Sequence, residues 1–185
     1  IEGYGVVVFS SAVRADHPIR RAAREAGLSC IRRGELLADL AQRKKLIAVA
    51  GSHGKTTTCG MIAYLMRSHG IEANYILGGL FNDETLPPSH HCASEWLLAE
   101  VDESDGTINE FTPHHTLLLN VDWDHADHYR ASADLEAAFA GLASRTRGTV
   151  WHPEGMRLVK GLKRAVAFPE SEPAGLTGRL NRGNR

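Results

Sequence analysis

Short apolar runs alternate with stretches of helical periodicity along most of this chain of 185 residues. The run 46–50 is apolar at every position, which is typical of a strand buried on both faces of a sheet. The stretch 132–145 instead repeats apolar residues three and four positions apart, as on one face of a helix. The alternation predicts an α/β fold, in which a parallel β-sheet is flanked by helices. The predicted strands are 5–9, 28–31, 46–50, 73–77, 96–101, 116–121, 149–151 and 165–168, and the predicted helices end near 25, 42, 68, 145 and 162.

Finer features of the pattern predict how these elements begin and pack. Asp16 is a candidate N-cap for the first helix, and Ser132 for the helix 132–145. The helix 56–68 is expected to bury Ile62, Leu65 and Met66 on one side. The polar segment 81–94 is predicted to be a surface loop.

A glycine turn between a strand and a helix carries the strongest chemical signal. Gly51 and Gly54 permit a tight turn, and Lys55 and Thr56 follow at the start of the predicted helix. Such a loop directs backbone N–H groups, a helix N-terminus and a lysine at one point, which suits a triphosphate, and the threonine hydroxyl suits Mg²⁺. The general phosphate-loop pattern has four residues between its first Gly and Gly-Lys, whereas two stand here.

Acidic side chains follow the predicted strand 96–101. Glu100, Asp102, Glu103 and Asp105 lie at its carboxyl end, which is the edge of a parallel sheet where ligands bind. Carboxylates at that edge are suited to Mg²⁺, so all four are candidates for a metal site. The alternative is a solvated acidic loop.

A second cluster of ionisable residues follows the strand 116–121. It contains Asp122, Asp124, His125, Asp127 and His128. Asp124 can orient the His125 ring, and His128 is assigned a structural or surface role. The cluster alone also fits a two-metal phosphoesterase, and the glycine loop alone fits a non-enzymatic nucleotide-binding module. An assay with and without ATP separates a ligase from the phosphoesterase.

Composition and charge bear on possible binding partners and on the cellular compartment. The net charge is −1, so no overall basic field predicts binding to nucleic acid or to a membrane surface. No apolar run approaches the roughly 20 residues of a membrane span. Cys30, Cys59 and Cys92 are scattered and are interpreted as reduced thiols of a cytoplasmic protein. A zinc site at His90, His91 and Cys92 is the less favoured alternative to a surface loop.

The three motifs together resemble a known family. The loop Gly-Ser-His-Gly-Lys-Thr-Thr-Thr at 51–58, the strand end Ala-Glu-Val-Asp-Glu-Ser-Asp at 99–105 and the segment 120–129 occur in the order and approximate spacing of the Mur ligases, the ATP-dependent amino-acid ligases of peptidoglycan synthesis. Within this family the chain is most similar to the branch that joins L-alanine to UDP-N-acetylmuramate. The branch that attaches a whole tripeptide to the same sugar nucleotide is the alternative.

The resemblance implies roles for individual residues. Glu100 is expected to bind one Mg²⁺ ion and His125 a second, and Asn120 is expected beside the phosphates. By the same resemblance Asp102, Glu103 and Asp105 are weaker metal candidates than Glu100. Gly78 and Gly79 are expected near the substrate. Residues 178–184 resemble an adenine-side motif, although Leu180 replaces its histidine. The complete set of candidates is Lys55 and His125 for catalysis; Gly51, Ser52, His53, Gly54, Lys55, Thr56, Thr57, Asn120, Asn181 and Asn184 for ATP; and Thr56, Glu100 and His125 for Mg²⁺.

The resemblance also predicts the domain organisation. Residues 1–43 contain two βα units, and no Gly-rich turn follows the first strand. Their segments 8–13 and 31–38 resemble the later part of the Rossmann-like, UDP-sugar-binding domain of the family. Residues 44–185 resemble an incomplete central ATP-binding domain of the P-loop type. The family's C-terminal amino-acid-binding domain is expected to be absent. The chain is therefore expected to be a fragment that binds Mg²⁺-ATP weakly and does not ligate by itself.

Overall fold

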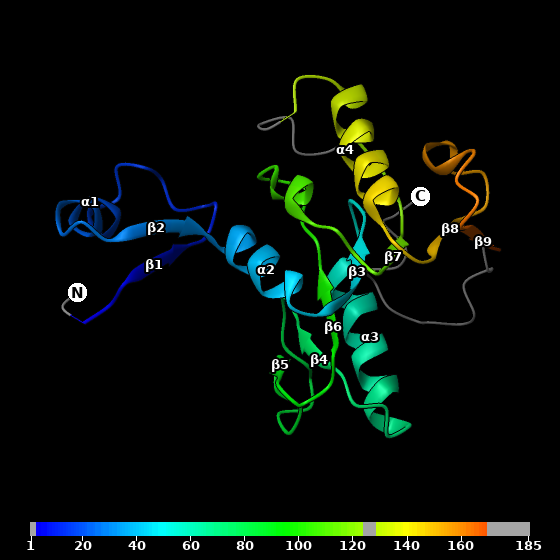
Figure 1. Ribbon diagram of the computed structural model, residues 1–185, viewed down its shortest axis with the longest axis horizontal. Coiled ribbons are helices and arrows are strands. Elements are labelled where there is room, and N and C mark those ends of the chain that lie inside the picture. The colour runs from blue at the N-terminus through cyan, green and yellow to red at the C-terminus, as the bar shows by residue number, and fades with distance from the viewer. Residues whose placement is uncertain (1–2, 124–128, 170–185) are drawn as a thin grey trace.

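The computed structural model describes residues 3–123 and 129–169. Within these ranges the chain forms a seven-stranded sheet and a separate two-stranded sheet, with helices around them (Figure 1). Neighbouring strands of the larger sheet are parallel except β4 and β5, so the prediction of a mainly parallel α/β fold is confirmed. In spatial order the larger sheet contains β5 (Ser89–His90), β4 (Asn74–Ile76), β6 (Trp96–Glu100), β3 (Lys45–Ala50), β7 (His115–Leu118), β8 (Val150–Pro153) and β9 (Ala165–Phe168).

The larger sheet has a hydrophobic core on each face. On one face, alternate residues of β3 such as Leu46 and Ala48 pack with α2 (Arg33–Gln42), α4 (Ser132–Arg145) and the short 3₁₀ helix η1 (Thr107–Glu110). On the other face, Val49 packs against α3 (Lys55–Ser68). Successive side chains of a strand point to opposite faces. This explains why β3 is apolar at nearly every position.

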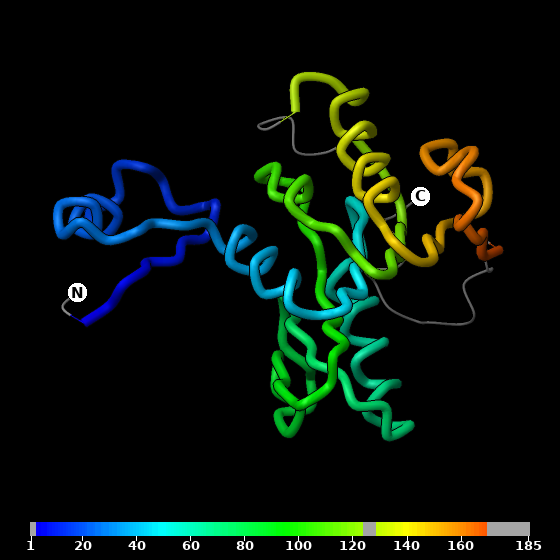
Figure 2. The backbone as a smooth tube through the Cα atoms, in the orientation of Figure 1, coloured from blue at the N-terminus to red at the C-terminus, as the bar shows by residue number. Residues whose placement is uncertain are grey.

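Residues 3–32 form a smaller unit. There β1 (Val6–Phe9) and β2 (Ser29–Arg32) pair in parallel, and α1 (Pro18–Glu25) connects them. Figure 1 and Figure 2 show this unit beside the larger sheet, with α2 between the two. Arg32 ties the unit to the larger body, because its guanidinium donates to the Asp105 carbonyl at 2.7 Å. The assignment of 1–43 to a sugar-nucleotide domain stays a prediction, and α2 itself buries Ala38 and Ala41 in the larger core.

Several local predictions are wrong, each for a physical reason. His17 caps α1 through its ring nitrogen, while the predicted cap Asp16 pairs with Arg14. Leu65 is 54% exposed, because Cys59 and Ala63 form the buried side of α3.

The remaining differences concern element lengths. The predicted helix 154–162 is only the 3₁₀ helix η2 (Arg157–Val159), since Gly155 and Gly161 have positive φ angles that end it on both sides. The predicted loop 81–94 includes β5, which pairs with β4. The helix at 132 begins after Ala131, so Ser132 is its first residue and not its cap.

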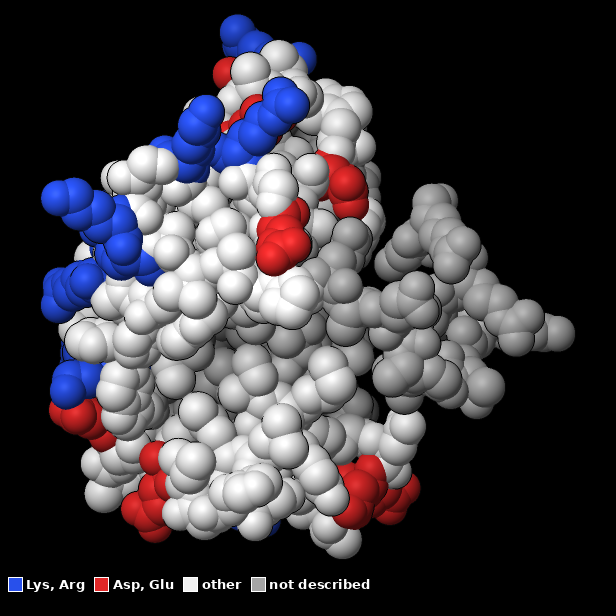
Figure 3. All heavy atoms as spheres, turned by 90° about the vertical axis from the view of Figure 1, so that its right-hand side faces the viewer, with Lys and Arg blue, Asp and Glu red and all other residues white. Residues whose placement is uncertain are grey.

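The described surface carries charges of both signs. On the face drawn in Figure 3, lysine and arginine side chains gather along one border, and uncharged side chains cover much of the remainder. None of the described helices is both long enough and apolar enough to cross a membrane.

Candidate functional site: a phosphate loop at the carboxyl edge of the sheet

The site lies where three neighbouring parallel strands end. In the register of the sheet, Glu100 at the end of β6 lies beside Val49, and Leu118 at the end of β7 lies beside Ala50. The loop 51–54 that follows β3 therefore lies between the segments that follow β6 and β7. Ligands of parallel sheets bind at this edge.

The glycines of the loop are required by its shape. Gly54 directly precedes α3 with a φ of 81°, a left-handed conformation that strains other residues. Gly51 has a φ of 149°, and a Cβ there would lie 3.0 Å from the Cβ of Leu119 and 3.1 Å from the backbone nitrogen and oxygen of Asn120. A residue with a side chain at position 51 would therefore push the loop away from β7. The first N–H groups of α3 have no partner within the helix and open at this loop.

Two side-chain clamps hold the loop to the segment after β7. Asn120 accepts a hydrogen bond from the His53 N–H at 2.8 Å and donates one to the His53 carbonyl at 3.1 Å. The Ser52 hydroxyl donates to the Asp122 carbonyl and accepts from the Asp122 N–H, both at 3.0 Å. Asn120, expected beside the phosphates, thus acts on the loop backbone, and Ser52 has a structural task that the sequence did not reveal.

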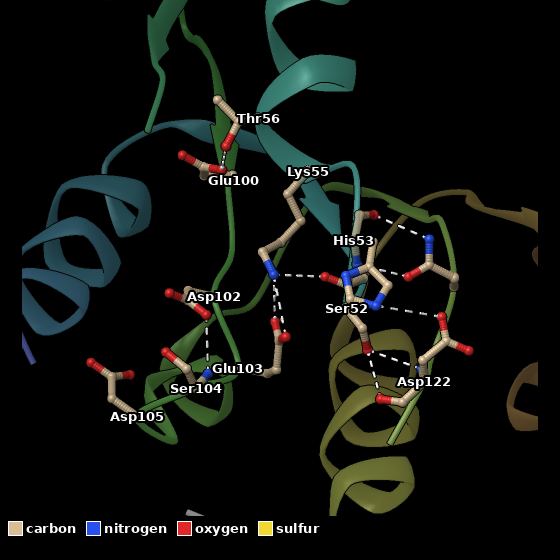
Figure 4. A network of polar contacts seen from close by, with 12 residues as sticks. Ser52, His53, Lys55, Thr56, Glu100, Asp102, Glu103, Ser104, Asp105 and Asp122 are labelled. Atoms are coloured by element: carbon tan, nitrogen blue, oxygen red, sulfur yellow. Dashed lines mark hydrogen bonds and ion pairs between the residues drawn. The ribbon is translucent and has the colours of Figure 1, made fainter. Parts of the chain in front are cut away.

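Lys55, the first residue of α3, forms a buried ion pair. Its ammonium lies 2.9 Å from Oε2 and 3.2 Å from Oε1 of Glu103, and it donates to the Gly51 carbonyl at 2.7 Å (Figure 4). The Glu103 side chain is fully buried, and that of Lys55 is 14% exposed. Sequence reasoning ranked Glu103 only as a weaker metal candidate and missed this pairing. The signal was available in the position of Glu103, just beyond a strand adjacent to the loop.

Thr56 and Glu100, each predicted as a magnesium ligand, lie in direct contact. The Thr56 hydroxyl donates to Oε2 of Glu100 at 2.7 Å. Two glycines make room for this contact: a Cβ on Gly78 would overlap the Glu100 carboxylate, and a Cβ on Gly79 would lie 2.9 Å from the Thr56 methyl carbon. The pair therefore presents two oxygen atoms beside the loop, a donor set that suits Mg²⁺.

The other two acidic residues of the strand end serve local structure. Asp105 accepts from the N–H and the hydroxyl of Thr107 at the start of η1. Burial would raise the pKa of Asp102, but the bond from the Ser104 N–H and the positive charges of Lys55 and Arg33 outweigh it, so the pKa of this carboxyl is lowered. Asp102 is thus held as a carboxylate near Lys55.

A cavity of about 570 Å³ adjoins the loop on the α3 side. Thr56, Thr57 and Gly79 line its end near the loop, and Met61 and Tyr64 contribute apolar surface further along α3. Thr57, predicted to bind ATP, therefore faces this cavity.

Several predicted site residues lie outside the described residues. They are Asp124, His125, Asp127 and His128 of the second cluster, and Leu180, Asn181 and Asn184 of the terminal segment. Their roles stay predictions.

The zinc alternative at residues 90–92 gains no support. His91 and the Cys92 backbone N–H both contact Oδ1 of Asn74, and His90 stacks on Tyr75. In the described part of the chain, no three His, Cys, Asp or Glu side chains are grouped so that they could hold a metal ion.

Comparisons with known families and with known sequences both find similarity to Mur ligases. Residues 49–151 match the model of the Mur ligase middle domain. The UDP-N-acetylmuramate–L-alanine ligase of Bifidobacterium longum (strain DJO10A) is 36% identical over 163 residues, which are 84% of this chain and 32% of that protein. The enzyme of the same name from Synechococcus sp. (strain RCC307) is 46% identical over 127 residues, 67% of this chain and 26% of that protein. The chain thus spans about a third or less of the length of these relatives.

Solved structures share the fold. UDP-N-acetylmuramate–alanine ligase from Thermotoga maritima superposes with a TM-score of 0.80 at 26% identity, covering 91% of this chain and 39% of that one. The UDP-N-acetylmuramate:L-alanyl-γ-D-glutamyl-meso-diaminopimelate ligase from Neisseria meningitides gives a TM-score of 0.70 at 21% identity, covering 84% and 53%. At that identity the second likeness concerns the fold alone.

Proposed function

This chain belongs to the Mur ligase family, and on that basis we propose that it supplies the ATP site of an enzyme that joins L-alanine to UDP-N-acetylmuramate. The observation that carries the proposal is the loop itself, in which Lys55, the start of α3 and the Thr56–Glu100 pair converge at the end of β3. The choice of L-alanine follows the names of the relatives at 36% and 46% identity. The tripeptide-attaching branch remains the alternative.

The chemical task that we propose is to bring a carboxylate to a triphosphate. In the proposed reaction the γ-phosphate of ATP passes to the carboxylate of UDP-N-acetylmuramate, and the amine of L-alanine then displaces phosphate from the acyl phosphate to form the amide. Both reactants are anions, so their mutual repulsion must be neutralised. Lys55 and the N–H groups at the start of α3 supply positive potential without needing a side-chain nucleophile.

The residues present fit a magnesium ion. The hydroxyl of Thr56 and the carboxylate of Glu100 are hard oxygen donors already in contact, and the lack of a Cβ at Gly78 lets the Glu100 carboxylate take this position. Bound there, Mg²⁺ would offset negative charge on the phosphates. Thr56 and Glu100 would hold it, and Asn120 and Ser52 would keep the loop backbone in place.

The test is calorimetry with ATP, with and without Mg²⁺, on the wild type and on Lys55→Ala. We expect binding that Mg²⁺ strengthens, and a loss of about tenfold or more in affinity in Lys55→Ala, because a charge-assisted contact to phosphate is removed. Lys163→Ala is a matched control, since Lys163 is exposed and precedes β9 at the edge of the sheet opposite the loop. Equal affinity in wild type and Lys55→Ala would contradict the assignment of the loop.

A second assay addresses the rival class. Phosphate release is measured with UDP-N-acetylmuramate and L-alanine, in the presence and absence of ATP. The ligase proposal requires any turnover to depend on ATP, whereas a phosphoesterase would release phosphate from a phosphoester without it.

A further inference from the structure

The ammonium group of Lys55 is fully engaged by protein acceptors. A lysine ammonium carries three N–H donors. Two acceptors are the carboxylate oxygens of Glu103 and the third is the carbonyl of Gly51. A phosphate oxygen can therefore bind Lys55 only if one of these contacts is given up.

We propose that Glu103 is a positioning residue that competes with the phosphates of the nucleotide for Lys55, so that nucleotide binding proceeds by exchange of one anionic partner for another. This inference rests on the proposed function and goes beyond it. It assigns Glu103 a task other than binding phosphate or a metal ion.

The geometry makes Glu103 the fixed partner and Lys55 the mobile one. The backbone carbonyl of Glu103 accepts from the Tyr129 hydroxyl at 2.8 Å and from the Gly106 N–H at 3.1 Å, so the segment is held from two sides. The Glu103 side chain is fully buried. Lys55 has a flexible four-carbon stem and stands at the mouth of the loop. The ammonium can therefore move toward a phosphate while the carboxylate stays in place.

The arrangement has two consequences for binding. Glu103 keeps the ammonium ordered and close to the loop, which limits the conformational entropy lost when phosphate arrives. It also lowers the apparent affinity, because only the fraction of molecules in which Lys55 has left Glu103 can make the phosphate contact. Removal of the competing charge should therefore tighten the binding of nucleotide, an effect opposite to that of losing a ligand.

The experiment compares dissociation constants for Mg²⁺-ADP and Mg²⁺-ATP in Glu103→Gln and wild type. Glutamine has nearly the same shape without the charge, and we expect the dissociation constant to fall roughly tenfold. Asp105→Asn is the matched control: it removes one charge from the same segment, can still accept from Thr107, and makes no hydrogen bond or ion pair with Lys55 among the described residues. We expect it to change affinity by less than about twofold.

A double variant separates exchange from simple repulsion. In a Lys55→Ala background, Glu103→Gln should bring no tightening, because the group for which Glu103 competes is gone. Tightening of equal size in both backgrounds would overturn the exchange. Should Glu103→Gln fail to fold, Glu103→Asp carries the test: its shorter arm weakens the pair, and an unchanged dissociation constant there would count against the proposal.

The remaining outcomes are also decisive. An increased dissociation constant in Glu103→Gln would make Glu103 a ligand of the bound metal–nucleotide and overturn the proposal while the proposed function stands. Wild type that binds no nucleotide would overturn the proposed function and this inference with it.

Discussion

Replacement of Asn120 by alanine tests whether the loop is held in shape from β7. Asn120 is half-buried, and its side chain makes two hydrogen bonds to the His53 backbone, one as acceptor at 2.8 Å and one as donor at 3.1 Å. Alanine cannot make either bond. The substitution leaves the charge of the site unchanged.

The expected magnitude follows from those two bonds. Each contributes on the order of 1 kcal/mol net, so the loop loses about 2 kcal/mol of preference for its bound shape. This corresponds to a roughly 30-fold weaker affinity for Mg²⁺-ATP. Asn120→Asp keeps the acceptor for the His53 N–H, but it places an oxygen opposite the His53 carbonyl and adds a negative charge beside the loop, so it should weaken binding at least as much. Asn109→Ala is the control, because Asn109 is exposed in η1.

Two measurements check this prediction. Calorimetry gives the affinity, and hydrogen exchange at the His53 amide reports the clamp without any nucleotide. In Asn120→Ala the exchange of that amide should accelerate about as much as the affinity falls. Affinity within twofold of wild type, together with unchanged exchange at His53, would refute the reasoning.

Two further predictions follow from the surroundings of the loop. Gly78→Ala should displace the Glu100 carboxylate, because the new Cβ would overlap it. A titration should then show a higher Mg²⁺ requirement for ATP binding. Gly5→Ala is the control and should match wild type, because its new Cβ would meet no atom within 4 Å. Burial raises the pKa of the Cys59 thiol to about 12, so at pH 8 a thiol reagent should label Cys30 and Cys92 and reach Cys59 only in denaturant. Because the folded state holds that proton more tightly than an unfolded thiol with a pKa of about 8.5, the free energy of unfolding should fall as pH rises above 8.5. Rapid labelling of all three thiols in the folded protein would contradict the burial of Cys59.

The sequence alone predicted the elements whose signals are local. The apolar run 46–50, the two glycines and the Gly-Lys-Thr start of α3 define a strand, a turn and a helix within one continuous stretch, and the structure contains all three. Thr56 and Glu100 were each predicted as magnesium ligands from local signals, and the structure brings their side chains into contact because β3 and β6 are neighbours in the sheet.

Local patterns were less reliable where a tertiary contact competes with them. Leu65 fits the helical period of α3, yet the buried side of that helix is formed by Cys59 and Ala63, which are small enough to approach Val49 closely. His17 replaced Asp16 as the cap of α1 because Asp16 pairs with Arg14 instead. Periodicity and residue type limit which residues can cap a helix or be buried, and the tertiary contacts determine which of them do so.

The partners of the loop were decided by the tertiary structure alone. Lys55 and Glu103 are 48 residues apart in the chain, and Asn120 is 67 residues from His53. Pairs so far apart leave no periodic signal in the sequence. An acidic residue after a strand is equally compatible with a metal ligand, a solvated side chain or the partner of a lysine. The sheet order, with β3 between β6 and β7, brings all of these groups to one edge. The sequence therefore determined what chemistry this edge contains, and the order of the strands determined which group meets which.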